Sequence, residues 1–202
     1  MSAIGGLDRA PAGPAKLTAF VRAVDALLAR TTDEQAILAE ARGHLAALVA
    51  TDDWLPDIYA APDPGRYRQY LLYRDPAARF SVVSFVWGPG QATPIHDHTV
   101  WGLVGMLRGS EIAERYERQG GALRLIGSDR SQAGDVDAVS PRIGDVHRVS
   151  NAVADGVSIS IHLYGGDIGA VERATYDGAG TPRPFVSGYA DAPVPILDAG
   201  VA

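Results

Sequence analysis

Two periodicities of apolar positions divide the chain into a helical part and a β-rich part. Between residues 17 and 49 apolar side chains recur every three or four positions, which predicts two amphipathic helices. Thr31 and Thr32 stand three residues before Glu34 and Gln35, and these two overlapping capping-box patterns predict the start of the second helix. We therefore expect a helical hairpin ahead of the rest of the fold.

From residue 67 onward the pattern changes to short runs rich in β-branched and aromatic residues, separated by Gly, Pro, Asp and Ser. They arrive about every 8–15 residues with no helical pattern between them, which favours an antiparallel barrel or sandwich over βαβ units. The runs are residues 67–73, 80–87, 100–107, 111–118, 146–150 and 157–164.

The expected architecture is therefore mainly β, in one structural domain with three parts. Residues 1–66 hold a loose arm (1–14), the helical hairpin and a Pro/Asp-rich connector, all packed on the barrel. Residues 67–180 form the barrel, and residues 181–202, which contain four prolines, form an extended tail over the surface.

Composition narrows the class of function. The chain has 202 residues, with 18 Lys and Arg against 24 Asp and Glu, and the net charge is −6. No basic block is present, so nucleic acid and anionic membranes are disfavoured as partners. No stretch reaches the ~18 apolar residues of a membrane span, and the N-terminus lacks a signal-peptide pattern, so we expect a cytoplasmic protein. Cysteine is absent, and any metal site must use imidazole and oxygen ligands.

A histidine pair is the strongest chemical signal. His96 and His98 stand two residues apart, so on a strand both would leave the same face, roughly 7 Å apart. His147 lies in another strand-like run beside a turn. Three histidines from two strands would form a set of neutral nitrogen ligands with coordination positions left open. The alternative is a pair that lies by chance on a solvated strand.

A second polar row, formed by Ser160, His162 and Tyr164, alternates with apolar residues in one strand-like run. On a strand these three side chains would share a face, where a chain of hydrogen bonds could orient the phenol and move a proton. The alternative is a half-exposed strand with its polar side chains in solvent.

The spacing around the histidines resembles the two-part cupin signature, G-x5-H-x-H-x3-E-x6-G followed by G-x5-P-x-G-x2-H-x3-N. Two departures are present: Gly102 stands where the family usually carries a glutamate ligand, and the second motif is displaced by one residue on each side of Pro141. The resemblance implies a double-stranded β-helix (jelly-roll) barrel. A site with three histidines and no carboxylate keeps the full charge of a divalent ion, which favours an anionic substrate and ionises a bound thiol.

A more specific resemblance extends over about residues 67–173. The HDHTVWG segment, the absence of the glutamate, the single later histidine and the S-x-H-x-Y row are together similar to the bacterial thiol dioxygenases, relatives of cysteine dioxygenase. The resemblance implies one Fe(II) per chain and conversion of a small thiol and O2 into a sulfinic acid. It also implies roles for six residues, with iron held by His96, His98 and His147 and an outer-sphere relay formed by Ser160, His162 and Tyr164.

The same resemblance separates two subgroups by how they hold the substrate carboxylate. Mammalian-type cysteine dioxygenases use an early arginine and a cysteine cross-linked to the tyrosine, whereas this chain has no cysteine and carries Gln69 at the position resembling that arginine. The bacterial subgroup with glutamine there has an arginine soon after the S-x-H-x-Y row, a place that Arg173 fits. This subgroup is similar to 3-mercaptopropionate dioxygenase, and it implies that Arg173 and Gln69 bind a small thiol carboxylate.

Several alternatives remain open at the level of the sequence. Cysteine or mercaptosuccinate could be the substrate, and zinc or nickel could replace iron in a cupin isomerase or hydrolase, because zinc also accepts three histidines. A non-catalytic cupin that binds a small ligand is a further class. Arg173 could be a surface arginine paired with Glu172 or Asp177, and Gln69 an ordinary residue at the barrel mouth. The carboxylate would then be bound by one of three other arginines: Arg66, Arg68 or Arg74.

Overall fold

The computed structural model describes residues 13–190 and 195–197 of the chain. The arm expected at residues 1–14 lies outside the described residues, except for residues 13 and 14, which begin the first helix. The described helices do not include one that is both long and apolar enough to cross a membrane.

The N-terminal hairpin consists of α1 (Gly13–Arg30) and α2 (Glu34–Val49), and a 3-10 turn, η1 (Asp57–Tyr59), lies in the connector. The capping residue of α2 is Asp33, whose carboxylate accepts a hydrogen bond from the Ala36 N–H at 2.7 Å. The prediction of a threonine cap is therefore wrong. A carboxylate satisfies the free N–H groups of the first turn and also interacts favourably with the helix dipole.

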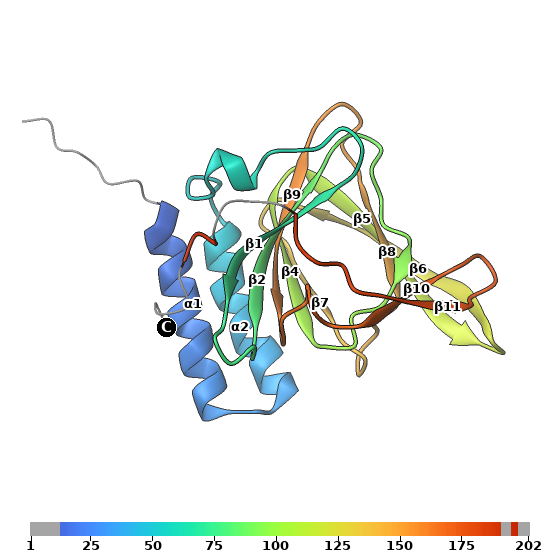
Figure 1. Cartoon of the computed structure of the whole chain (residues 1–202), viewed down its shortest axis with the longest axis horizontal. Helices are drawn as coiled ribbons and strands as arrows, with labels where there is room; N and C mark the ends of the chain where they lie inside the picture. The colour runs from blue at the N-terminus through green and yellow to red at the C-terminus, as the bar shows by residue number, and fades with distance from the viewer. Residues whose placement is uncertain (1–12, 191–194, 198–202) are drawn as a thin grey trace, which may run out of the picture.

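The described residues contain eleven strands in two antiparallel sheets, which face each other in Figure 1. The first sheet has the order β1-β2-β9-β4-β7, and the second has the order β11-β10-β3-β8-β5-β6. This arrangement is the expected double-stranded β-helix, or cupin jelly-roll barrel. The bounds are β1 (Arg68–Arg74), β2 (Ser81–Trp87), β3 (Ile95–His96), β4 (Gly102–Arg108), β5 (Ser110–Gln119), β6 (Ala122–Gln132), β7 (Val136–Val139), β8 (His147–Asn151), β9 (Ser158–Tyr164), β10 (Arg173–Tyr176) and β11 (Pro182–Phe185).

The six predicted runs correspond to β1, β2, β4, β5, β8 and β9. The other five strands carry weak local signals. Four of them are only two to four residues long, and β6 is an exposed, largely polar arm that pairs with β5 along its whole length. Such strands form because a neighbouring strand supplies hydrogen bonds, which a pattern along one segment does not reveal.

Helices cover the outer face of the first sheet (Figure 1), so its central strands are buried on both sides. All seven positions of β2 and of β9 are buried. Helix α2 lies so close to β4 that a Cβ atom at Gly105 would be 2.9 Å from Leu45 Cγ. The half-exposed alternative for the S-x-H-x-Y strand is therefore wrong, because its apolar face packs against the helices and its polar face lies inside the barrel.

The C-terminal segment begins as part of the barrel and not as a surface tail. Strand β11 pairs with β10, and the chain then passes along β1, where the Ala190 N–H donates to the Gln69 carbonyl at 2.8 Å. This path brings residues 185–188 to the mouth of the barrel. The later part of the expected tail, residues 191–194 and 198–202, lies outside the described residues.

Candidate functional site

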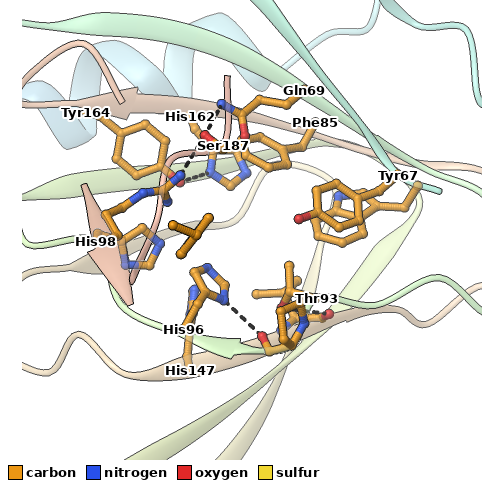
Figure 2. A pocket seen from close by; sticks show the side chains of 15 residues that line it. Tyr67, Gln69, Phe85, Thr93, His96, His98, His147, His162, Tyr164 and Ser187 are labelled. Atoms are coloured by element: carbon orange, nitrogen blue, oxygen red, sulfur yellow. Dashed lines mark hydrogen bonds between the residues drawn. The ribbon is translucent and has the colours of Figure 1, made fainter. Parts of the chain in front are cut away.

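Three imidazoles converge inside the barrel, as Figure 2 shows. The ring centroid of His96 lies 4.9 Å from that of His98 and 4.7 Å from that of His147, and the centroids of His98 and His147 are 4.8 Å apart. Their candidate ligand nitrogens all lie within 4.8 Å of one another, and all three residues are buried. In the part of the chain that the structure describes, this is a donor group able to hold a metal ion.

The backbone that presents His98 differs from the expectation. His96 lies in β3 and pairs in register with His147, but β3 contains only Ile95 and His96. His98 therefore lies in the loop after the strand, next to Thr99, whose φ is 60°. The prediction that both histidines extend from one strand is wrong, and the two rings meet because the loop turns back toward β8.

Asp145 holds this loop in place, and sequence reasoning missed it. Its Oδ2 accepts hydrogen bonds from the N–H groups of His98 (3.0 Å) and Thr99 (2.9 Å), and its Oδ1 lies 2.9 Å from His98 Nδ1. Burial acts to raise the pKa of Asp145, but these hydrogen bonds outweigh it and the pKa is lowered. A carboxylate two residues before His147 is the signal that could have revealed this partner.

The hydrogen bonds of His96 and His98 leave Nε2 of each ring free to bind a metal ion. Nδ1 of His98 faces the Asp145 carboxylate, and Nδ1 of His96 lies 3.1 Å from the Pro94 carbonyl oxygen. Each Nδ1 therefore carries the proton, and each Nε2 has a free electron pair for a metal ion. Burial lowers the pKa of His96 to about 3, and it holds the pKa of His147 well below its usual range. Neutral imidazoles are the state that binds metal, so this donor set fits a divalent transition metal.

Gly102 explains why no glutamate joins the three histidines. A Cβ atom at this position of β4 would lie 2.7 Å from Cδ1 of Tyr164, closer than real contacts allow. The Tyr164 ring occupies that space and stacks beside His98, with 5.5 Å between the ring centroids. The position that could present a carboxylate therefore accommodates a phenol.

The polar row of β9 forms the expected chain of hydrogen bonds. Ser160 Oγ lies 2.8 Å from His162 Nε2, and His162 Nδ1 lies 2.8 Å from the Tyr164 hydroxyl oxygen. The Phe85 ring covers the imidazole, with 4.2 Å between centroids. Burial holds the pKa of His162 well below its usual range and raises the pKa of Tyr164. The row is thus a neutral imidazole between two hydroxyl groups.

Arg173 lies in the same pocket as the histidines, at the start of β10. It is 5% exposed, its guanidinium lies 4.7 Å from the centroid of the Phe185 ring, and its Nη2 donates to Ser187 Oγ at 2.7 Å. Within the described residues it has no carboxylate in salt-bridge contact, and its Nε has no hydrogen-bond partner. The surface alternative is wrong, since Asp177 is paired instead with Arg183 at 4.0 Å.

Gln69 forms a hydrogen bond to the same serine. Its Nε2 donates to Ser187 Oγ at 3.2 Å and to the Gly188 carbonyl at 3.0 Å, and the residue is buried. Ser187 therefore joins Gln69 to Arg173. It was missed because it lies in the expected tail, where no local pattern marks it.

The other arginines considered for the carboxylate do not line this pocket. Arg68 is paired with Asp63 and Arg74 with Asp167, while Arg66 is exposed.

An aromatic wall completes the pocket. Tyr67 stacks on Trp87 with 4.6 Å between centroids, and burial raises the pKa of the Tyr67 phenol. In Figure 2 the Tyr67 ring lies across the pocket from Tyr164. The pocket has a cavity volume of about 40 Å³, which limits it to a small ligand.

Comparison with known proteins identifies one matching family model, described as cysteine dioxygenase type I, over residues 14–175. Solved structures similar to this chain include a conserved protein with a double-stranded β-helix domain from Klebsiella pneumoniae subsp. pneumoniae MGH 78578 (18% identity, 63% of this chain and 91% of that chain, TM-score 0.43). Another is a cupin superfamily protein from Desulfitobacterium hafniense DCB-2 (14% identity, 56% of this chain and 91% of that chain, TM-score 0.42). These identities and TM-scores are too low to support an argument, so the description of the fold rests on the strand order.

Proposed function

The chain belongs to the cysteine dioxygenase type I family, and from this membership we propose that it is an Fe(II)-dependent thiol dioxygenase. It binds one iron through His96, His98 and His147 and converts a small thiol carboxylate and O2 into the sulfinic acid, with 3-mercaptopropionate as preferred substrate. The observation that supports this substrate class is the buried Arg173 guanidinium, which lies beside the histidines without a carboxylate partner among the described residues.

The overall reaction, R–SH + O2 → R–SO2H, places both oxygen atoms on sulfur and needs no external reductant. Fe(II) held by His96, His98 and His147 would supply a cationic centre that favours the thiolate form of the substrate, together with the electrons that activate O2. The protein's own residues orient the substrate and control its protons.

Arg173 binds the substrate carboxylate. A guanidinium offers parallel N–H donors that match a carboxylate, and a buried guanidinium gains most from such a partner because water does not compete. The hydrogen bond to Ser187 and the contact with Phe185 hold the guanidinium at the pocket wall, which fixes one end of the substrate while the thiol reaches the histidines.

The charges of the pocket favour a thiol with one carboxylate and no amino group. No Asp or Glu is present among its described lining residues, so the ammonium group of cysteine has no anionic partner there. Arg173 is the one Arg or Lys in that lining, so the second carboxylate of mercaptosuccinate has no matching cation. Both arguments favour 3-mercaptopropionate.

Tyr164 positions the polar atoms of the bound substrate. Its hydroxyl group is held by His162 Nδ1, and its ring lies beside His98, so the hydroxyl is directed from the relay toward the pocket. Because the pKa of Tyr164 is raised, the phenol stays protonated and is able to donate a hydrogen bond to a thiolate.

The test is oxygen uptake by anaerobically iron-loaded protein offered 3-mercaptopropionate, L-cysteine and cysteamine in parallel, with the sulfinate identified. We expect strong uptake with 3-mercaptopropionate, weaker uptake with cysteine and the weakest with cysteamine, which lacks the carboxylate. A preference for cysteine would retain the iron chemistry and refute the specificity argument. No uptake with any thiol would refute the dioxygenase and favour a zinc or nickel cupin, or a binding module.

A further inference from the structure

A second cavity shares part of its wall with the substrate pocket. His147 and Val149 line both spaces, whereas Tyr164 and Arg173 line only the substrate pocket. The second cavity has a volume of about 170 Å³ and extends to Ile143, whose side chain is exposed. An apolar cavity of about 150 Å³ accommodates benzene, so the second cavity has room for one small organic molecule.

Most of the wall of the second cavity is apolar. Met106, Val139 and Val149 contribute buried side chains to it, and Tyr116 adds an aromatic ring. The thioether sulfur of methionine makes favourable contacts with aromatic rings. An aromatic molecule in this cavity would therefore gain free energy both from leaving water and from contact with Met106.

One buried polar side chain of this wall has an unsatisfied oxygen. Glu111, on β5, is 3% exposed, and its Oε1 has no hydrogen-bond partner among the described residues. Burial raises the pKa of Glu111 to about 8, so the carboxyl group is mostly neutral at pH 7 and is able both to donate and to accept a hydrogen bond. Unsatisfied buried polar atoms are rare in folded proteins, and a polar group on a bound molecule would satisfy this one.

The other Asp and Arg side chains of the described lining already have partners. Arg115 pairs with Asp129 at 2.7 Å. The carboxylates of Asp137 and Asp145 accept hydrogen bonds from a serine and from backbone N–H groups of the loop after β3, respectively. Arg115 is the one Arg or Lys in the described lining, so an anionic molecule would find no free positive charge there.

We propose that the second cavity binds a small neutral molecule with an aromatic ring and one hydroxyl group, with the ring against Met106 and the hydroxyl group hydrogen-bonded to Glu111. A hydroxyl group donates and accepts as a carboxyl group does, so the pair is satisfied whichever of the two gives the proton. This ligand differs in class from a thiol carboxylate, because the carboxylate would be unpaired in this cavity. The site is independent of the proposed dioxygenase activity and is tested on the metal-free protein.

NMR titration with benzyl alcohol tests the site. The chain contains two methionines, Met1 and Met106, so methyl-labelled methionine gives a signal inside the cavity that Met106→Leu assigns. We expect benzyl alcohol to shift the Met106 methyl signal in a saturable way, with a Kd of about 1 mM, within the limit for so small a ligand. Benzoate should bind at least about tenfold more weakly, because its charge is unpaired in the cavity. Absence of a saturable Met106 shift, or equal affinity for benzoate, would overturn the proposal.

Substitutions at position 111 test the hydrogen bond, with toluene as the probe that lacks the hydroxyl group. Glu111→Met should shift the ratio of the two Kd values about tenfold in favour of toluene, whereas Glu111→Gln, which still donates and accepts, should keep the ratio within about twofold. Glu114→Met is the matched control, because Glu114 lies on the same strand, is paired with Arg148 at 2.9 Å and does not line the cavity. An unchanged ratio in Glu111→Met would refute the role of Glu111.

A substitution that fills the cavity tests its location. Ala113 lies on β5 in the lining of the second cavity, and Ala113→Leu should abolish the Met106 shift with both probes. This variant keeps the site testable if Glu111→Met folds poorly, and a shift that persists in it would refute the site. A wild-type protein without oxygen uptake would refute the proposed function but would leave these titrations unaffected.

Discussion

A hydrogen atom in place of a side chain at position 102 allows Tyr164 to lie beside His98. One residue thus removes a carboxylate from the donor set and admits a phenol to the pocket. Arg173 is a second case at this scale, since the proposed substrate class rests on this one buried cation, which has no carboxylate partner among the described residues. Both effects are steric or electrostatic and involve few atoms, so single substitutions test them.

Gly102→Ala should displace the Tyr164 ring and lower kcat about tenfold or more, because the added Cβ meets Cδ1 at 2.7 Å. Metal content should be unchanged, since the three histidines do not move. Gly43→Ala is the control: an added Cβ meets nothing within 4 Å, and the helix gains about 0.5–1 kcal/mol of stability. Steady-state kinetics and metal analysis would check this, and a wild-type kcat in Gly102→Ala would contradict it.

Arg173→Ala should raise KM for 3-mercaptopropionate about 10- to 100-fold, which corresponds to the loss of a charge-assisted hydrogen-bonded pair. The KM for cysteamine, which has no carboxylate, should change little. Arg74→Ala removes a cation that does not line the pocket and serves as the control. The KM of wild type and of both variants for 3-mercaptopropionate and cysteamine, measured in parallel, tests this prediction. Equal effects of Arg173→Ala on both thiols would move the carboxylate site elsewhere.

At the scale of elements, the site is assembled from the ends of short segments and from one central strand. Strand β9 carries the hydrogen-bonded row of Ser160, His162 and Tyr164 on its inner face and core residues on its outer face, so helix packing and the geometry of this row depend on the same backbone. The loop before β8 contributes through a contact with another loop and not through a strand. Asp145 in that loop holds the loop after β3, and this contact between two loops orients His98.

Asp145→Asn should weaken metal affinity about 10- to 100-fold, as is typical when the partner of a metal-binding histidine is changed. An amide cannot hold His98 Nδ1–H and two backbone N–H groups as a carboxylate does. Titration of the metal-free protein with Co(II) or Fe(II) measures the effect. Asp137→Asn, a change to an exposed carboxylate bonded to Ser131, should leave affinity unaltered, and equal affinities of all three proteins would rule out this role.

At the scale of the whole molecule, the helical hairpin and the barrel share one core. Buried side chains from α1, α2, β2 and β9 belong to a single apolar cluster. A polar connection adds to it at the β1–β2 turn, where Arg79 pairs both with buried Asp75 and with Asp25 of α1. The turn of the barrel and the first helix are therefore stabilised together.

Asp75→Asn should lower the free energy of unfolding by about 2 kcal/mol at neutral pH, because the buried carboxylate loses its charge-assisted hydrogen bonds to Arg79 and to two backbone N–H groups. The Arg79 side chain, helped by backbone N–H groups, holds the pKa of Asp75 below its usual value of 3.8. A depressed folded-state pKa stabilises the protein above that value and loses its contribution as pH falls through the folded pKa. The gap between wild type and variant should therefore narrow below about pH 4.

Denaturant unfolding at several pH values measures the difference in the free energy of unfolding between wild type and Asp75→Asn. Asp53→Asn, which alters an exposed pair with Lys16, should have little effect at any pH. A gap between wild type and Asp75→Asn that stays constant down to pH 2 would show that the Asp75 charge contributes nothing.

Local patterns along the chain were sufficient for the helical hairpin, for six strands, and for the histidines and the polar row as candidate site residues, whereas Arg173 and Gln69 were indicated only by the family resemblance. Side-chain periods of 3.6 and 2 depend only on neighbouring residues, and the alternation of Ser160, His162 and Tyr164 alone predicts that they share a face. The absence of cysteine excluded thiolate metal ligands and a cross-link to Tyr164, and this follows from the composition alone.

Only the tertiary structure decided how these pieces combine. Asp145 meets His98 across forty-seven positions of sequence, and Ser187 meets Gln69 across 118, so no local pattern contains either contact. Burial of Arg173 and of Glu111 likewise depends on which segments cover them. Folding brings together atoms from distant parts of the chain, and desolvation then sets their protonation and their need for partners, which is why the buried Arg173 guanidinium without a carboxylate partner among the described residues emerges only in three dimensions.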